Sequence, residues 1–303
     1  MALPPRPARL TDLAPGVRRV LAENPSPMTY WGTNSYIVGT GAVAVIDPGP
    51  ADPDQIAAIL AALGPDETIS HIFVTHAHLD HSPGASLLAA ETGAPVLAFG
   101  DAQAGRSAQM AALAAQGGLA GGEGVDAKFA PDRVLSDGAV VVSGDWQLEA
   151  IWTPGHFGNH LSYALPKARS LFCGDVVMGW ASSLVSPPDG DLAAFMTSLD
   201  RLAARRDSVY YPGHGDPIQA PAARLAELRA HREMRGRQIA EALRAAPGTA
   251  AELAARIYTE TPVSLLPAAT RNVLAHLIEM ASKKEAHLDG ALRADSVFTA
   301  LEE

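Results

Sequence analysis

Five short apolar runs, each followed at once by a small polar turn, constrain this chain more than any other feature of its sequence. The runs lie at 42–46, 72–75, 148–152, 171–173 and 208–211. Runs of this length, rich in β-branched residues and bounded by Gly and Pro, are typical of short strands. A His or an Asp stands just past every run, at Asp47, His76, His156, Asp175 and His214. Strands that end at a common sheet edge would bring these side chains together into a site.

Helical segments lie between the runs. One is predicted over 53–63 and ends at Gly64. A second begins with Ser82 as N-cap and Pro83 at the first helical position, and ends before Gly93. A third spans 192–206. Strands that alternate with helices in this way predict a layered α/β architecture.

The chain changes character near Pro217 and becomes helical to the end. Helices are predicted over 221–246, from a capping box at Thr249 and Glu252, and over 266–284. Asp289-Gly290 then suggests a hairpin turn. This pattern predicts a winged-helix-like appendage. Its apolar stripe, at Leu225, Leu228, Ile239 and Leu243, should pack on the rest of the chain or on a second subunit, so a homodimer is one expected arrangement.

Residues 105–124 form an insertion that ends in a dense run of glycines. Glycine density permits many backbone states. We interpret the segment as a helix followed by a mobile loop, and the hypothesis is a lid over the site. An ordinary surface connection is the alternative.

The segment Thr75-His76-Ala77-His78-Leu79-Asp80-His81 carries the strongest chemical signal. In an extended chain residues i and i+2 point to the same side, so His76 and His78 can hold one ion, whereas Asp80 and His81 point towards a second. With the later residues the candidate metal ligands are His76, His78, Asp80, His81, His156, Asp175 and His214. Five imidazoles and two carboxylates suit two divalent ions, zinc first, and the single cysteine excludes a Cys-based cluster.

These motifs resemble the signature of the metallo-β-lactamase superfamily, over about residues 28–219. Segments 30–36, 187–191 and 211–215 are most similar to the glyoxalase II-like branch and to the beta-lactamase-like protein two group. The resemblance implies an αββα sandwich as the catalytic domain over 1–216, with the C-terminal helical, winged-helix-like domain over 217–303. It also implies two Zn²⁺ ions per chain. The first would be held by His76, His78 and His156, the second by Asp80, His81 and His214, with Asp175 as the bridge.

The expected activity is hydrolysis of a small ester, thioester or related substrate by metal-bound hydroxide. Asp80 would orient the nucleophile or pass a proton, and His160 would contact the substrate or support a ligand. Asp47 is a further candidate to orient a ligand. An endoribonuclease or phosphodiesterase of the same fold is the alternative, followed by a mononuclear iron dioxygenase. True zinc β-lactamases have Cys or Ser where this chain has Asp175, which argues against antibiotic hydrolysis.

The net charge and the N-terminal sequence limit which partners and which cellular location are expected. The formal net charge of −10 and a pI near 5.4 disfavour long polyanions. Residues 249–290 hold five acidic and four basic side chains, with no basic stripe. The C-terminal segment is therefore not expected to bind DNA, although RNA remains an alternative partner. The first residues lack the apolar core of a signal peptide, and no long apolar run could span a membrane. A cytoplasmic enzyme with a small-molecule substrate is expected.

Overall fold

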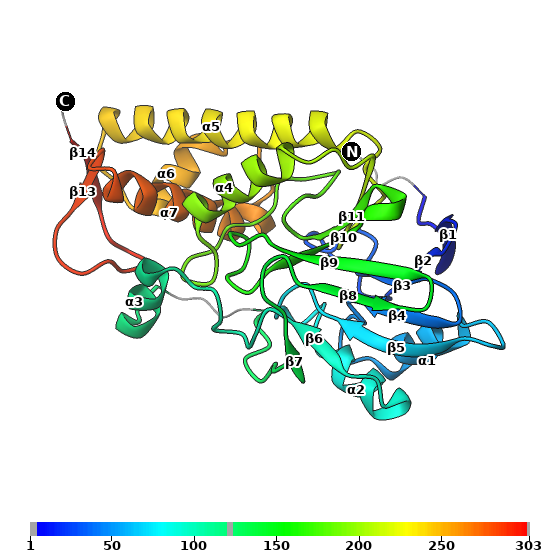
Figure 1. Cartoon of the computed structure of the whole chain (residues 1–303). Helices are drawn as coiled ribbons and strands as arrows, with labels where there is room; N and C mark the ends of the chain where they lie inside the picture. The colour runs from blue at the N-terminus through cyan, green and yellow to red at the C-terminus, as the bar shows by residue number, and fades with distance from the viewer. Residues whose placement is uncertain (1–4, 120–123, 302–303) are drawn as a thin grey trace.

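Two β-sheets lie face to face at the centre of the molecule (Figure 1). The computed structural model describes residues 5–119 and 124–301. Among these residues the first sheet has the order β1-β2-β3-β4-β5-β6-β7, with β1 Leu10–Ala14, β2 Val17–Leu21, β3 Asn34–Val38, β4 Ala42–Ile46, β5 Thr68–Phe73, β6 Val96–Ala98 and β7 Arg133–Val134. The second has the order β12-β11-β10-β9-β8, with β8 Val140–Ser143, β9 Trp146–Trp152, β10 Leu161–Leu165, β11 Ser170–Gly174 and β12 Val209–Pro212.

The central strands are buried on both faces, which explains their nearly continuous apolar sequence. In β4, Val43 and Val45 pack under the helices outside the sheet, whereas Ala44 and Ile46 face the second sheet. This alternation is the period of two that a pleated strand imposes. β4 pairs in parallel with β5, and β5 with β6, as expected for strands covered on both sides.

Helices cover both outer faces and complete the αββα sandwich. α1 (Pro53–Ala61) and α2 (Gly84–Thr92) pack on the first sheet, and α4 (Leu192–Ala203) and α5 (Pro221–Ala245) on the second. The predicted N-cap at Ser82 is wrong. Its hydroxyl donates to the backbone oxygen of His78 and to Asp126, and the N-cap of α2 is Pro83, which makes no side-chain cap hydrogen bond.

One edge of the sandwich gathers the turns that follow β4, β5, β9, β11 and β12. Backbone hydrogen bonds link these turns: Leu161 N–H donates to Thr75 O between the two sheets, and Gly213 N–H donates to Gly174 O within the second sheet. Thr33, just before β3, forms an isolated bridge with His214. The turns are therefore fixed relative to one another before any side chain is considered.

The C-terminal part forms a second core that shares one helix with the sandwich. It contains α5, α6 (Ala250–Ile257), α7 (Leu266–Ser282) and the hairpin of β13 (Ala286–Leu288) with β14 (Phe298–Ala300). Along α5, Leu225 and Leu228 pack on the second sheet layer, whereas Ile239 and Leu243 enter the C-terminal core. The predicted packing of this stripe is confirmed. The hairpin exists, but its strands are joined by residues 289–297 and not by a two-residue Asp289-Gly290 turn.

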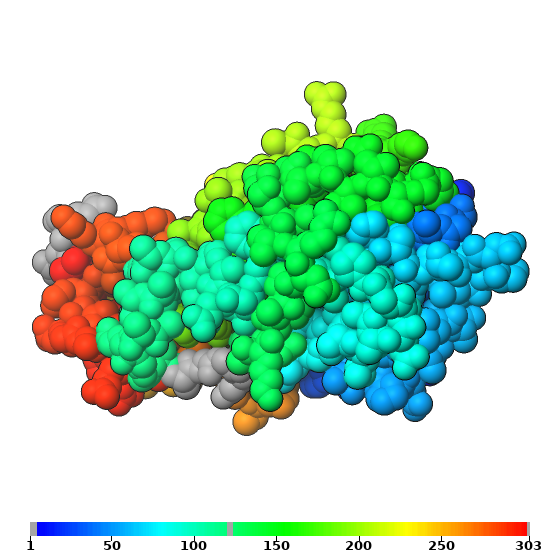
Figure 2. Space-filling view, turned by 60° about the horizontal axis from the view of Figure 1, so that its bottom comes forward, coloured from blue at the N-terminus to red at the C-terminus, as the bar shows by residue number. Residues whose placement is uncertain are grey.

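The remaining short elements are η1 (Pro166–Ala168), η2 (Val263–Leu265) and α3 (Ala108–Gln116). α3 docks against the C-terminal hairpin region, beside which it lies in Figure 2. Met110 enters the C-terminal core, and Gln116 donates to Leu292 O. Beyond α3, Leu79 N–H donates to Gly124 O, so the far end of the predicted lid borders the metal-ligand segment. Its glycines at 121 and 122 lie outside the described residues. Within the described residues, no helix is long and apolar enough to cross a membrane.

Candidate metal centre

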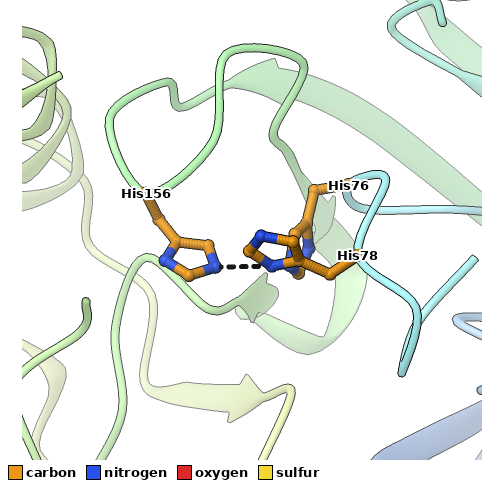
Figure 3. Close-up of side chains that lie close together, drawn as sticks. All are labelled: His76, His78 and His156. Carbon is orange, nitrogen blue, oxygen red and sulfur yellow. Dashed lines mark hydrogen bonds between the residues drawn. The ribbon is translucent and has the colours of Figure 1, made fainter. Parts of the chain in front are cut away.

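Three histidines from two strand ends form the first ligand group (Figure 3). His76 and His78 follow β5, and His156 follows β9. His76 Nε2 lies 2.9 Å from His78 Nδ1, and His156 Nε2 lies 3.1 Å from the same atom. A tetrahedral zinc ion with bonds of about 2.0–2.1 Å holds its ligand atoms roughly 3.3 Å apart. The three nitrogens stand close to that spacing.

A second group lies beside the first and shares Asp175 with it. His214 Nε2 is 3.2 Å from Asp80 Oδ2 and 3.3 Å from His81 Nε2, and His81 Nε2 is 3.5 Å from Asp80 Oδ2. Asp175 reaches both groups: Oδ2 lies 3.3 Å from His214 Nε2 and 3.8 Å from His156 Nε2, and Oδ1 lies 3.6 Å from His81 Nε2. The seven residues proposed from the sequence therefore surround one contiguous space.

The environment of Asp175 fits a carboxylate that bridges cations. Its Oδ1 is buried and accepts no hydrogen bond within the described part of the chain. An ionised carboxylate oxygen with no partner is costly to bury, and a bound cation removes the cost. Gly213 makes room for this carboxylate, because a Cβ at that position would collide with Asp175 Oδ1.

The outer ring nitrogens of the ligand histidines are held by neighbouring oxygens. His76 Nδ1 lies 2.9 Å from Thr75 Oγ1, and His156 Nδ1 lies 2.7 Å from Leu184 O. His214 Nδ1 lies 3.1 Å from Gly32 O. A partner of this kind fixes the ring orientation and leaves the other nitrogen free to bind a metal.

Asp47 contacts two parts of the site at once. Its Oδ2 accepts from Thr75 Oγ1 at 2.7 Å and lies 2.9 Å from His81 Nδ1, and its Oδ1 accepts from Thr75 N–H at 2.7 Å. The residue adopts a φ of 49° directly after β4. This left-handed conformation is uncommon outside glycine, although Asp tolerates it better than most residues. These contacts are the ones that the predicted orienting role of Asp47 requires.

His160 lies beneath Asp175 and is fully buried. Its Nε2 accepts the backbone N–H of Asp175 at 3.1 Å, and its Nδ1 lies 2.9 Å from Thr153 Oγ1. Because Nε2 accepts, the ring is neutral, and burial holds its pKa well below the ordinary value. The structure thus places His160 as a support of Asp175 with no surface open to a substrate.

The first ligand group is electrically neutral. Burial, together with repulsion between neighbouring rings, lowers the pKa of His78 to about 3 and holds that of His76 well below its ordinary value. Burial also lowers the pKa of His156. These three rings therefore present unprotonated nitrogens, the form that binds a metal.

The second group pairs imidazoles with carboxylates. Burial opposes a charged ring there, but Asp80 and Asp175 outweigh it and raise the pKa of His81 to about 9. Burial likewise opposes a charge on His214, and again Asp175 and Asp80 outweigh it and hold the pKa of that ring well above its ordinary value. A divalent cation that entered this group would displace protons and take over their role as counter-charge.

Sequence reasoning missed the backbone acceptors of the site. Leu184 O and Gly32 O hold ligand histidines, yet every residue carries a carbonyl, so no residue type marks them. Thr75 and Thr153 were also not assigned. Thr75 stands directly before His76, where its hydroxyl meets a ring nitrogen. Thr153 carries no such signal, because the ring that it contacts, that of His160, lies seven residues further along the chain.

An αββα sandwich with a His- and Asp-rich site at one sheet edge defines a class of metal-dependent hydrolases. The model of the metallo-beta-lactamase superfamily matches residues 28–214, and that of the beta-lactamase associated winged helix domain matches 249–284. The chain belongs to the metallo-β-lactamase superfamily and is a hydrolase of that class. This confirms the predicted family, fold and winged-helix-like appendage.

The relatives match over 80% or more of the chain. A beta-lactamase-like protein 2 homolog of Drosophila melanogaster is 30% identical over 98% of this chain and 97% of its own length. An atrochrysone carboxyl ACP thioesterase of Paecilomyces divaricatus is 33% identical over 80% of this chain and 68% of its own. A metallo-beta-lactamase family protein of Thermus thermophilus has a TM-score of 0.77 at 24% identity, covering 96% of this chain and all of that one.

Proposed function

We propose that this chain is a dinuclear zinc hydrolase that cleaves a small ester or thioester. The observation that carries the proposal is the pair of ligand groups that share Asp175. In this assignment His76, His78 and His156 hold one ion, Asp80, His81 and His214 hold the other, and Asp175 bridges them. Zinc, when bound, lowers the pKa of its water towards 7 and polarises a carbonyl oxygen.

Asp80 is the proposed catalytic residue of this chain. Its side chain is 29% exposed, whereas those of His81 and His214 are 0% and 1% exposed. One carboxylate oxygen, Oδ2, belongs to the second ligand group, which leaves the other to accept a proton or a hydrogen bond at the open side of the site. This position suits a group that orients the attacking water and moves its proton.

The cysteine of the chain is badly placed for covalent catalysis. Cys173 is fully buried, its thiol donates to Val177 O, and burial raises its pKa well above the ordinary value. A buried thiol in that state is a poor nucleophile. Direct attack of water on the substrate is therefore the reaction that these residues support.

A thioester or ester with an apolar acyl group is the proposed substrate class. Leu79 stands between His78 and Asp80 and is 50% exposed, so an apolar side chain lies at the open side of the ligand segment. The thioesterase named above is similar to this chain over most of its length, which supports a thioester carbonyl as the reacting centre. The acidic net charge adds a preference for small substrates over nucleic acid.

The test is turnover with zinc restored after chelation, on a panel of thioesters, esters, lactones, phosphodiesters and RNA. We expect thioester or ester cleavage, and loss of most turnover in Asp80→Asn with the fold retained. Asp54→Asn, an exposed carboxylate in the first turn of α1, is the matched control and should keep full activity. Cleavage of RNA or phosphodiesters alone would contradict the proposed ester or thioester substrate and favour the phosphodiesterase alternative. Oxygen consumption with iron, and no hydrolysis, would replace the proposal with the dioxygenase alternative.

A further inference from the structure

The C-terminal helices hold a segment of the catalytic sandwich that has no regular structure of its own. Residues 183–187 lie between β11 and α4, and the side chains that hold this segment come from α5 and α7. We call these side chains, Arg232, Arg271 and Asn272, the clamp.

Asn272 of α7 is the centre of the clamp. Its Oδ1 accepts the backbone N–H of Val185 at 3.1 Å and Arg232 Nη1 at 2.8 Å. Arg232 of α5 also donates to Ser183 O, and its guanidinium lies 5.0 Å from the centre of the Phe195 ring. Arg232 is only 3% exposed, so these contacts are made where water cannot replace them.

Arg271 holds the other end of the segment. Its Nε donates to Ser186 Oγ at 2.8 Å, and a second nitrogen donates to Pro187 O. Its Nη1 donates to Leu119 O at 2.6 Å, which ties the end of the α3 segment to the same point. The planar guanidinium fork gives this contact a fixed direction that a lysine could not reproduce.

The clamped segment reaches the metal centre through one carbonyl. Leu184, between Ser183 and Val185, accepts the hydrogen bond of His156 Nδ1 at 2.7 Å. The other nitrogen of that ring, Nε2, faces the first ligand group, 3.1 Å from His78 Nδ1 (Figure 3). The clamp thus holds both chain neighbours of the residue whose carbonyl sets the direction of a ligand.

We propose that the C-terminal winged-helix domain is a positioning device for the metal centre: the clamp fixes Leu184 O and thereby aims His156 at the first ion. This inference rests on the proposed dinuclear site. It makes Asn272, Arg232 and Arg271 positioning residues, because none of them lies in a ligand group. It also accounts for the polar face of α7, which is turned towards the sandwich and not towards a separate partner.

The experiment measures the two stepwise zinc affinities of the full chain by competition with a chromophoric chelator. In Asn272→Leu, which keeps the branched shape and loses the acceptor, we expect one affinity to fall about 10-fold or more and the other to stay unchanged. Asn272→Asp keeps an oxygen for Val185 N–H and Arg232 and should restore the wild-type value. Val273→Ala, on the same helix but in the C-terminal core, is the matched control and should leave both affinities unchanged.

Each outcome decides the proposal. One weakened affinity with rescue by Asn272→Asp supports it, whereas two equal losses, or none, overturn it. If Asn272→Leu does not fold, as judged by circular dichroism, Arg271→Lys is measured in its place, with the same single loss expected. If the wild-type chain itself binds fewer than two ions, the proposed dinuclear site fails, which is a result distinct from failure of the clamp.

Discussion

At the scale of single residues, the site depends on oxygens that hold histidines as much as on the histidines. Asp47 contacts Thr75 and His81, Leu184 O contacts His156, and Gly32 O contacts His214. Outer contacts of this kind set ring orientation and basicity, and their loss commonly costs about 10–100-fold in metal affinity. Substitutions of residues outside the ligand groups should therefore lower the metal affinity.

Asp47→Asn tests this for the second group. The amide keeps one acceptor oxygen but offers an N–H₂ to His81 or Thr75, which both donate there. We expect the zinc affinity to fall about 10-fold or more and the free energy of unfolding to fall by about 1–3 kcal/mol. Chelator competition and urea unfolding measure the two effects. An unchanged affinity would show that Asp47 serves the fold alone.

Asp175→Ala should weaken the binding of both ions, because Asp175 Oδ2 faces both ligand groups. His160→Ala should weaken the binding of the two ions less. It removes the acceptor of the Asp175 backbone N–H and a contact with Thr153, but it leaves the bridging carboxylate in place. Metal content after dialysis, measured by elemental analysis, ranks the two variants. Equal retention in both would contradict the bridging role.

At the scale of elements, sequence patterns located nearly every helix, because periodicity and caps are local signals. The capping box at Thr249 and Glu252 opens α6 as predicted. Contacts between elements were less accessible. The sequence of residues 289–297 contains no pattern that predicts a long hairpin loop. The hydrogen bond between Asn272 and Val185 joins positions 87 residues apart, which local patterns cannot predict. The ligand types at 76–81 were predictable because they are contiguous, whereas their backbone supports carry no residue signature.

The packing of α5 against α7 predicts a loss of stability in acid. His276 of α7 is 5% exposed, and its Nε2 has no hydrogen-bond partner among the described residues. Burial, with repulsion from Arg232, His231 and Lys283, lowers its pKa to about 3. The unfolded chain, with a pKa near 6.5, takes up a proton below that pH and the folded chain does not. Titration of this group therefore leaves the free energy of unfolding unchanged above about pH 6.5 and lowers it by about 2 kcal/mol at about pH 5.

His276→Leu removes the titrating ring and its unpartnered nitrogen. We expect the drop in unfolding free energy between about pH 7 and pH 5 to be smaller in this variant than in the wild-type chain, by about 2 kcal/mol. Urea unfolding at the two pH values measures it. Val273→Ala changes a buried side chain of the same helix and titrates nothing, so it should keep the wild-type pH dependence. An equal dependence in His276→Leu would place the acid sensitivity elsewhere.

At the scale of the whole molecule, α5 connects the hydrophobic core of the sandwich with the C-terminal core. Its first half packs on the second sheet and its second half packs in the C-terminal core. It lies along one side of the molecule, above α4, α6 and α7 in Figure 1. A winged-helix domain attached in this way has its third helix, α7, bonded to the catalytic sandwich through Asn272 and Arg271. The helix that such domains present to a nucleic-acid groove is therefore committed to an internal contact.

This arrangement predicts that the intact chain does not bind duplex nucleic acid tightly. Binding to a phosphate backbone needs a basic surface, and its strength falls steeply with salt. Here the net charge is −10, and two arginines of α5 and α7, Arg232 and Arg271, already make hydrogen bonds within the molecule.

Fluorescence anisotropy with a labelled DNA duplex and an RNA hairpin, at about 50 and 200 mM salt, measures the interaction. We expect weak signals that differ little between the two probes. Tight binding that weakens by orders of magnitude at the higher salt would show that α7 is released from the clamp, and would favour the ribonuclease alternative over hydrolysis of a small thioester.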